Sequence, residues 1–156
     1  MPSINASTEA KIHLDEPVTS LLRMKGPGIW SISPDSTVYE AIEQMAEKRI
    51  GALLVLREGK LEGIISERDY ARKVILKNRS SQDTPVSEIM TAPAVTVTLT
   101  DSVRHCMEIM TQGRFRHLPV VEAGRVLGIL SIGDLVKAVI EEQTAQIEQL
   151  ERYIAG

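Results

Sequence analysis

The chain of 156 residues contains one cysteine and three histidines, and this scarcity excludes several kinds of site. A single cysteine cannot form a disulfide within the chain, and it suits a protein of a reducing compartment. No His or Cys pair has the spacing of metal ligands, and no Gly-x-Ser-x-Gly motif is present. We therefore expect no metal site and no enzymatic activity. Cys106 lies on the apolar face of a predicted helix, where a buried structural thiol is expected.

Long apolar runs and an excess of positive charge are also missing. No apolar stretch reaches the roughly 20 residues that a membrane-spanning helix needs, and no secretory signal is visible at the N-terminus. The formal net charge is -3, which does not favour nucleic-acid binding. The hydrophobic fraction of 43% and the charged fraction of 25% are ordinary for a soluble protein. We therefore expect a cytoplasmic protein that binds neither nucleic acid nor membranes.

The main positive feature is an internal repeat. Shifted by 65 residues, the segment 38–75 aligns without a gap with 103–140. Chance would make about two or three aligned pairs identical, and the sequence has many more. Two copies predict a two-fold pseudo-symmetry rather than a filamentous array. The identical pairs include Met45/Met110, Arg49/Arg114, Leu53/Leu118, Gly63/Gly128, Ser66/Ser131 and Asp69/Asp134.

Each copy predicts the same order of elements, β-α-β-β-α. Apolar residues at helical spacing predict helices that begin near Val38 and Val103, and Thr37 with Glu40 is spaced as a capping box. A unit of this size has a small sheet with one coverable face and is marginal alone. We therefore expect an α+β fold in which two units pack sheet to sheet. The predicted strands are 29–32, 52–56 and 61–65 in the first copy and 95–98, 118–121 and 126–130 in the second.

The predicted organisation along the chain has four parts. In order, they are a flexible N-terminal segment at 1–17, a first unit at 18–80, a second unit at 81–140 and an amphipathic C-terminal helix at 141–156. Apolar residues on that last helix form a stripe of two heptads, made of Ile140, Ile147, Leu150 and Ile154. Two heptads are too few for a stable coiled coil alone, but they suffice to dock on the core or on a second copy.

The candidate site follows the second hairpin strand of each copy. The run Gly63-Ile64-Ile65-Ser66-Glu67-Arg68-Asp69 returns as Gly128-Ile129-Leu130-Ser131-Ile132-Gly133-Asp134. An apolar strand thus leads into a helix start, where unpartnered backbone N–H groups favour an anion. Aspartate can accept two sugar hydroxyls at once, and an arginine can bind a phosphate through two hydrogen bonds. Because only the first copy has an arginine inside the motif, Arg68, we expect it to carry more of the phosphate binding.

Each of these features also has a purely structural explanation. Ser-x-x-Asp is the spacing of a helix capping box, which needs no ligand. Arg116 and His117 follow a helix end, where cations suit the helix dipole; alternatively, one of them reaches a phosphate across a cleft, and His117 then makes binding sensitive to pH near about 6–7. Trp30 either fills a core or interface or stacks on a base. The basic residues after the first motif are expected on a solvated helix face: Arg72, Lys73, Lys77 and Arg79.

The unit order, the duplicated Gly-x-x-Ser-x-x-Asp motif and the segment Arg116-His117-Leu118-Pro119-Val120 together resemble a pair of CBS domains, the tandem arrangement called a Bateman module. The resemblance covers residues 18–140. It implies clefts between the units that bind AMP, ADP, ATP, NAD(H) or S-adenosylmethionine, and it implies a homodimer. By residue, it implies ribose contacts from Asp69 and Asp134, phosphate contacts from Ser66 and Ser131, and backbone facing the adenine around Ser31, Ile32, Thr96 and Val97.

These observations favour a regulatory module that senses energy or redox state by binding an adenine nucleotide, with no other cofactor required. The candidate ligand-binding residues are Ser31, Ile32, Ser66, Arg68, Asp69, Thr96, Val97, Arg116, His117, Ser131 and Asp134. One alternative is a structural dimerisation module whose clefts stay unoccupied. A second alternative, a nucleotide-processing enzyme, has no catalytic constellation to support it.

Overall fold

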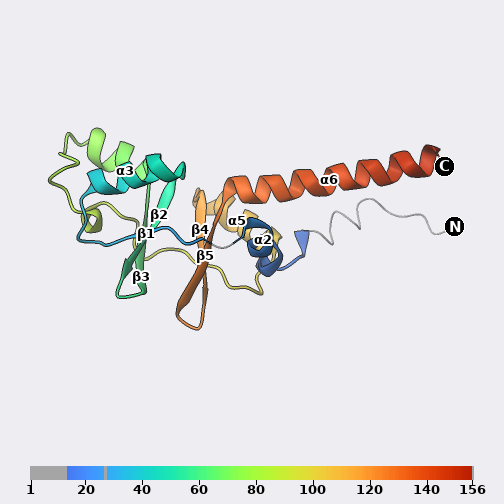
Figure 1. The fold of residues 1–156 in the computed structure, drawn as a ribbon, viewed down its shortest axis with the longest axis horizontal. Helices are drawn as coiled ribbons and strands as arrows, with labels where there is room; N and C mark the ends of the chain where they lie inside the picture. The colour runs from blue at the N-terminus through green and yellow to red at the C-terminus, as the bar shows by residue number, and fades with distance from the viewer. Residues whose placement is uncertain (1–13, 27, 156) are drawn as a thin grey trace.

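The computed structural model describes residues 14–26 and 28–155 and has the expected α+β fold (Figure 1). The elements of the first copy are β1 (Ser31–Ile32), α3 (Val38–Lys48), β2 (Ala52–Arg57), β3 (Lys60–Ser66), α4 (Glu67–Tyr70) and the π-helix η1 (Ala71–Ile75). Those of the second copy are α5 (Val103–Gly113), β4 (His117–Glu122), β5 (Arg125–Ser131) and α6 (Ile132–Ala155). A short helix precedes each copy: α2 (Val18–Lys25) and the 3-10 helix η2 (Val86–Glu88).

Both hairpins and both central helices form as the sequence pattern predicts. Strands β2 and β3 pair antiparallel, as do β4 and β5, and β3 contacts β5 between the two copies. Helix α3 begins at a complete capping box, in which the Thr37 side chain accepts from the N–H of Glu40 and the Glu40 side chain accepts from the N–H of Thr37. The buried thiol of Cys106 lies in the core of the second copy, where burial raises its pKa to about 11.

The predicted strand at 95–98 is wrong, although its counterpart β1 forms. Strand β1 pairs parallel with β2, and the N–H of Leu54 donates to the carbonyl of Trp30. The residue equivalent to Leu54 is Pro119, which has no N–H to donate. The second copy therefore keeps only a single parallel bridge, between Val97 and Val120.

The short helices are exchanged between the two cores. Val18 and Leu21 of α2 are buried in the core of the second copy, whereas Val86 and Ile89, at and just after η2, are buried in the core of the first. The predicted boundary between residues 80 and 81 therefore follows chain order but not packing. Which core an amphipathic segment covers is decided by tertiary contact, which helical spacing alone does not specify.

Two equivalent glycines admit the exchanged segments. A Cβ atom on Gly63 would lie 2.6 Å from the carbonyl oxygen of Thr91, and one on Gly128 would lie 2.9 Å from Cδ2 of Leu22. Backbone hydrogen bonds in both directions join Ile64 to Thr91 at the first of these contacts. The repeated glycine therefore has a packing role, because a side chain at Gly63 would meet the backbone of the exchanged segment and one at Gly128 would displace the end of Leu22.

The predicted flexible segment at 1–17 falls largely outside the described residues, and its described end is held in place. Leu14 packs against the core of the second copy, and Pro17 forms an antiparallel bridge with Ser102. Nε of Arg104 lies 3.3 Å from Oδ1 of Asp15. Residues 14–17 therefore contact the second copy, while the rest of the predicted flexible segment lies outside the described residues.

Helix α6 continues through the predicted C-terminal part without a break and extends beyond the rest of the described fold (Figure 1). Its stripe is uncovered by the described chain: Ile140, Ile147 and Leu150 are half exposed and Ile154 is 83% exposed. Among the described helices, none is long and apolar enough to cross a membrane. The stripe is therefore an unpartnered apolar face on a projecting helix.

Candidate functional site

Two cavities lie between the copies, one at each Ser-x-x-Asp motif. The first has a volume of about 500 Å³ and combines the Ser66 motif with the loop between α5 and β4. The second has a volume of about 450 Å³ and combines the Ser131 motif with the loop between α3 and β2. Gly51 and His117 line both cavities. Each cavity therefore needs residues from both halves of the chain.

The first motif forms a complete capping box. The N–H of Asp69 donates to Oγ of Ser66 at 3.2 Å, and the N–H of Ser66 donates to Oδ2 of Asp69 at 2.9 Å. The prediction that Ser-x-x-Asp forms a helix capping box is thus confirmed. Because both residues also line the first cavity, the same groups remain placed to contact a ligand.

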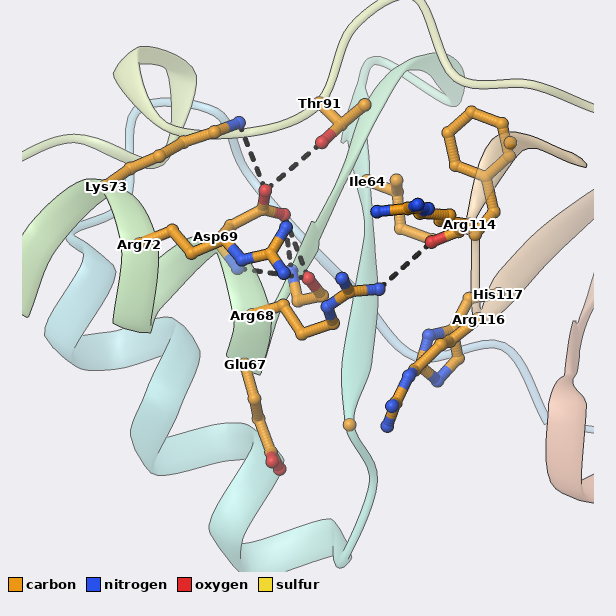
Figure 2. Close-up of a pocket in the computed structure, with 14 residues that line it drawn as sticks. Ile64, Glu67, Arg68, Asp69, Arg72, Lys73, Thr91, Arg114, Arg116 and His117 are labelled. Atoms are coloured by element: carbon orange, nitrogen blue, oxygen red, sulfur yellow. Dashed lines mark hydrogen bonds and ion pairs between the residues drawn. The ribbon is translucent and has the colours of Figure 1, made fainter. Parts of the chain in front are cut away.

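Asp69 is nearly buried, and both of its carboxylate oxygens are engaged. Oδ2 also accepts from the hydroxyl of Ser66 at 3.1 Å. Oδ1 accepts from the hydroxyl of Thr91 at 3.2 Å and lies 3.1 Å from Nζ of Lys73, which in turn donates to the carbonyl of Ile89 (Figure 2). Four donors fill the acceptor capacity of a carboxylate. A further donor can therefore reach Asp69 only by displacing one of them.

Four guanidinium groups surround the first cavity, two from each copy. Figure 2 shows Arg68 and Arg72 beside Asp69, facing Arg114 and Arg116 across the cavity. Nη1 of Arg68 donates to the carbonyl oxygen of Arg114 at 3.0 Å and so bridges the copies. Within the described chain, no carboxylate pairs with any of the four. The cavity is therefore suited to an anionic group, which guanidinium binds in a planar, bidentate geometry.

Arg49 and Arg114 share an unusual backbone conformation. Each is the C-cap of its helix in the left-handed region, with φ of 56° in both cases. Glycine is the usual residue there, because a Cβ atom makes this conformation costly. Arg114 lines the first cavity and Arg49 the second. An arginine at this position in both copies places a guanidinium on the cavity formed with the other copy's motif.

The second cavity has a different distribution of charge. The N–H of Ser131 donates to Oδ2 of Asp134 at 2.7 Å, and the N–H of Asp134 donates to Oγ of Ser131 at 3.1 Å. Nζ of Lys25 donates to the same Oδ2 at 2.8 Å and to the carbonyl of Ile129 at 2.6 Å. Burial alone would raise the pKa of Asp134, but the hydrogen bonds from Lys25 and Ser131 outweigh it and lower the pKa below its usual value.

His117 and Trp30 complete the wall of the second cavity. Burial lowers the pKa of His117 below its ordinary value of 6.5, and the charge of Lys25 lowers it further. The expected titration near pH 6–7 is therefore displaced to lower pH. Trp30 is 42% exposed and carries Nζ of Lys48 at 4.3 Å from its ring centre, so it does not fill a core.

The structure brings most of the predicted site residues together. The first cavity is lined by Ser66, Arg68, Asp69, Arg116 and His117, and the second by His117, Ser131 and Asp134. Neither lining includes the four residues predicted to face an adenine: Ser31, Ile32, Thr96 and Val97. Ser31 and Ile32 pair with β2, and Val97 is buried in the core of the second copy.

Sequence reasoning missed several residues of the cavities. Arg72 and Lys73 are exposed, as expected of a solvated helix face, and they also line the first cavity. Arg49 could have been found from its identity with Arg114 in the repeat. Thr91 and Lys25 carried no such signal, since each reaches a carboxylate that is distant in sequence. Among the described residues, no group of three or more His, Cys, Asp or Glu could hold a metal ion.

Comparison with known proteins places these features in a family. The family model described as CBS domain matches residues 25–76 and 86–141. The CBS domain-containing protein CBSX3 of Arabidopsis thaliana, named as mitochondrial, is 40% identical over 148 residues, which cover 89% of this chain and 72% of that protein. CBSCBSPB5 of the same plant is 41% identical over 119 residues, and the match covers 74% of this chain but only 22% of that protein.

A solved structure agrees with the fold as well as the sequence. A protein with CBS domains from Burkholderia ambifaria, provisionally named a signal-transduction protein, is 48% identical. It superposes with a TM-score of 0.79 over 82% of this chain and 96% of its own.

Proposed function

The chain belongs to the CBS-domain family, and we propose that it is a regulatory module that binds an adenine nucleotide in the cavities between its two copies. AMP, ADP, ATP, NAD(H) and S-adenosylmethionine are the candidate ligands that the family resemblance supplies. The relatives are named for their domains or for signal transduction, and not for a reaction, which supports a regulatory role over an enzymatic one. A cytoplasmic location is part of this proposal.

One observation carries the proposal: guanidinium groups from both copies meet at a single cavity beside a helix start. Arg68 and Arg72 approach from one side and Arg114 and Arg116 from the other. Positive groups held close together repel one another, and an anion between them removes that repulsion. A phosphate chain is such an anion, and it accepts hydrogen bonds from several guanidinium groups at once.

Sugar binding at the first motif requires an exchange of partners. The carboxylate of Asp69 already accepts from Ser66 and Thr91 and pairs with Lys73. A ribose hydroxyl would replace Thr91 or Lys73, and the released ammonium of Lys73 would remain close enough to meet a phosphate. Thr91 is also hydrogen bonded to Ile64 through the backbone, so its main-chain position would persist after such an exchange.

Ligand occupancy would be transmitted because the cavity residues come from both copies. A ligand that contacts Arg72 and Arg116 together favours the arrangement in which the copies are close. If the copies can also separate, the ligand changes the ratio of the two arrangements only by as much as it binds the close arrangement better than the separated one. The exposed stripe of α6 supports a homodimer as the receiver. Ile140, Ile147 and Ile154 recur every seven residues, and Leu150 lies between the last two, as in the pattern that favours two-stranded coiled coils.

A structural dimerisation module with empty cavities is the second candidate function. The observation that favours it is the complete set of capping hydrogen bonds at Ser66/Asp69 and Ser131/Asp134, which explains these residues without a ligand. The four arginines of the first cavity, which pair with no carboxylate of the described chain, argue against it, because a cap does not require them. The two functions differ in one measurable respect, which is stabilisation by a nucleotide.

Thermal denaturation with AMP, ATP, NAD(H) or S-adenosylmethionine tests the proposal. A ligand present at 100 times its Kd is expected to add about 2.7 kcal/mol to the unfolding free energy. The gain should disappear in Arg72→Ala/Arg116→Ala and persist in Arg125→Ala, whose side chain lies on β5 outside both cavities. No gain with any of the ligands in the unaltered protein would leave the structural module as the better explanation.

A further inference from the structure

Lys25 connects the exchanged helix α2 to the second motif. It is the last residue of α2, and its ammonium group donates to Oδ2 of Asp134 at 2.8 Å and to the carbonyl of Ile129 at 2.6 Å. The side chains of Lys25 and Asp134 are 33% and 27% exposed. This ion pair is thus partly shielded from water, which makes it stronger than an ion pair at an open surface.

The ammonium takes the part that sugar hydroxyls would play. A ribose hydroxyl is a hydrogen-bond donor to a carboxylate, and the Lys25 ammonium is already such a donor at the same carboxylate. Lys25 and Asp134 both line the second cavity, together with Ser131 and Trp30. The contact is therefore made inside the proposed ligand site and not on a separate surface.

The first cavity has only an uncharged counterpart of this contact, in which the hydroxyl of Thr91, just after η2, donates to Oδ1 of Asp69 at 3.2 Å. By their packing, Val18 and Leu21 of α2 correspond to Val86 and Ile89, so Met90 corresponds to Leu22 and Lys25 lies in the longer connection of the first copy. Asp69 is paired with Lys73, a residue on the following helical turn of the same segment, so that ion pair joins neighbours in sequence. Lys25 and Asp134 are separated by 109 residues. The donor from the exchanged segment is therefore a neutral hydroxyl in the first cavity and a charged ammonium in the second.

We propose that Lys25 is an intramolecular competitor for Asp134, so that the second cavity binds an adenosine-containing ligand more weakly than its shape and remaining side chains would allow. This inference rests on the proposed function, because it concerns the same class of ligand. A ligand that enters the second cavity has to displace Lys25, and it thereby frees the end of α2. Gly26, with φ of 81°, and Gly28, with φ of 145°, follow Lys25 and adopt backbone conformations that other residues rarely take.

Trp30 makes the second cavity separately measurable, because it is the only tryptophan of the chain and lines that cavity. Titration with adenosine, followed by tryptophan fluorescence, should give a Kd about tenfold lower in Lys25→Met than in the unaltered protein, as expected for loss of one hydrogen bond between charged groups. Adenosine carries no phosphate, so the loss of a positive charge does not itself weaken its binding. Lys137→Met on exposed α6 is the matched control and should leave the Kd unchanged.

Two results would overturn the inference. An unchanged Kd in Lys25→Met would show that the lysine does not compete, and a higher Kd would make it a ligand contact. Lys25→Gln, which keeps a polar group of similar length, should give an intermediate Kd. Failure of the proposed function is recognised separately: no nucleotide then stabilises the unaltered protein against heat, and neither protein shows a fluorescence change with adenosine, which also removes the competitor role.

Discussion

Arg49 and Arg114 occupy equivalent left-handed helix ends, and each lines the cavity formed with the other copy's Ser-x-x-Asp motif. Both residues adopt a backbone conformation that is unfavourable for a residue with a Cβ atom. Nη1 of Arg68 donates to the carbonyl oxygen of Arg114, so the same residue also serves as a contact between the copies. Substitution of Arg114 can therefore show whether this residue contributes to the unfolding free energy, to ligand affinity or to both.

Replacing Arg114 with glycine should weaken nucleotide binding without unfolding the protein. Glycine relieves the cost of the left-handed conformation, so we expect the unfolding free energy to stay within about 1 kcal/mol of its original value. The Kd for ATP, measured calorimetrically, should rise about tenfold or more, because one hydrogen bond to a charged group is lost. Arg49→Gly is the matched control, since it alters the second cavity. A large loss of stability in Arg114→Gly would show that its role is structural.

Alanine at the two repeated glycines should have unequal effects. At Gly63 the new Cβ would meet a backbone oxygen of Thr91 at 2.6 Å, whereas at Gly128 it would meet the flexible end of Leu22 at 2.9 Å. We expect Gly63→Ala to cost about 1–3 kcal/mol and Gly128→Ala to cost less, because a side chain moves more easily than a paired backbone. Urea denaturation of both variants measures the difference. Equal costs would contradict the packing role assigned to the exchanged segments.

The unfolding free energy should fall when the pH is lowered from 7 towards 5, and His117 should contribute to that fall. Burial holds the pKa of His117 below 6.5 in the folded protein. The unfolded chain then binds a proton at this residue near pH 6.5 while the folded protein does not, so stability decreases as pH falls through this range. His117→Gln should reduce the slope, measured by urea denaturation at several pH values. The lowered pKa of Asp134 adds a loss of stability that develops below about pH 5, under this range.

If the slope of unfolding free energy against pH is unchanged in His117→Gln, the pKa of His117 does not differ between the folded and unfolded protein. A slope of the opposite sign in the unaltered protein would require a group that is protonated on folding within the same range. The same substitution in the presence of a nucleotide would show whether the ligand alters the exposure of this residue.

Charge on the stripe of α6 should separate a dimer into single chains. Ile147→Glu and Leu150→Glu place a carboxylate on the exposed apolar face, and we expect the dimer dissociation constant from sedimentation equilibrium to rise at least about tenfold. Gln149→Glu adds the same charge on the polar side of the helix and should leave association unchanged. Dimers that resist both stripe substitutions would place the interface elsewhere on the protein.

Local elements were predictable because their signals lie close together in sequence. The capping box at Thr37 and Glu40 fixed the start of α3, and the apolar runs around Gly59 and Gly124 fixed both hairpins. The missing strand at 95–98 was also readable in principle, since Pro119 cannot donate the hydrogen bond that Leu54 makes. These features depend on one residue or on one turn of chain.

The parts that escaped prediction depend on contacts between distant segments. Val18 has the same local pattern whichever core it covers, and only the folded chain assigns it to the second copy. Lys25 contacts Asp134, and Thr91 contacts Asp69. Each pair is far apart in sequence, so no local motif predicts these contacts. The ligand role of the cavity residues stays a prediction, because their positions are compatible with it but do not require it.

The exchange of α2 and η2 has a consequence for how the two copies can persist. A protein fragment with only the first copy would lack η2, which covers its core, and a fragment with only the second copy would lack α2. Melting of either half would therefore expose apolar surface in the other, and both cavities would be lost in a single cooperative step. Although the sequence is duplicated, each copy therefore depends on the other for a complete hydrophobic core.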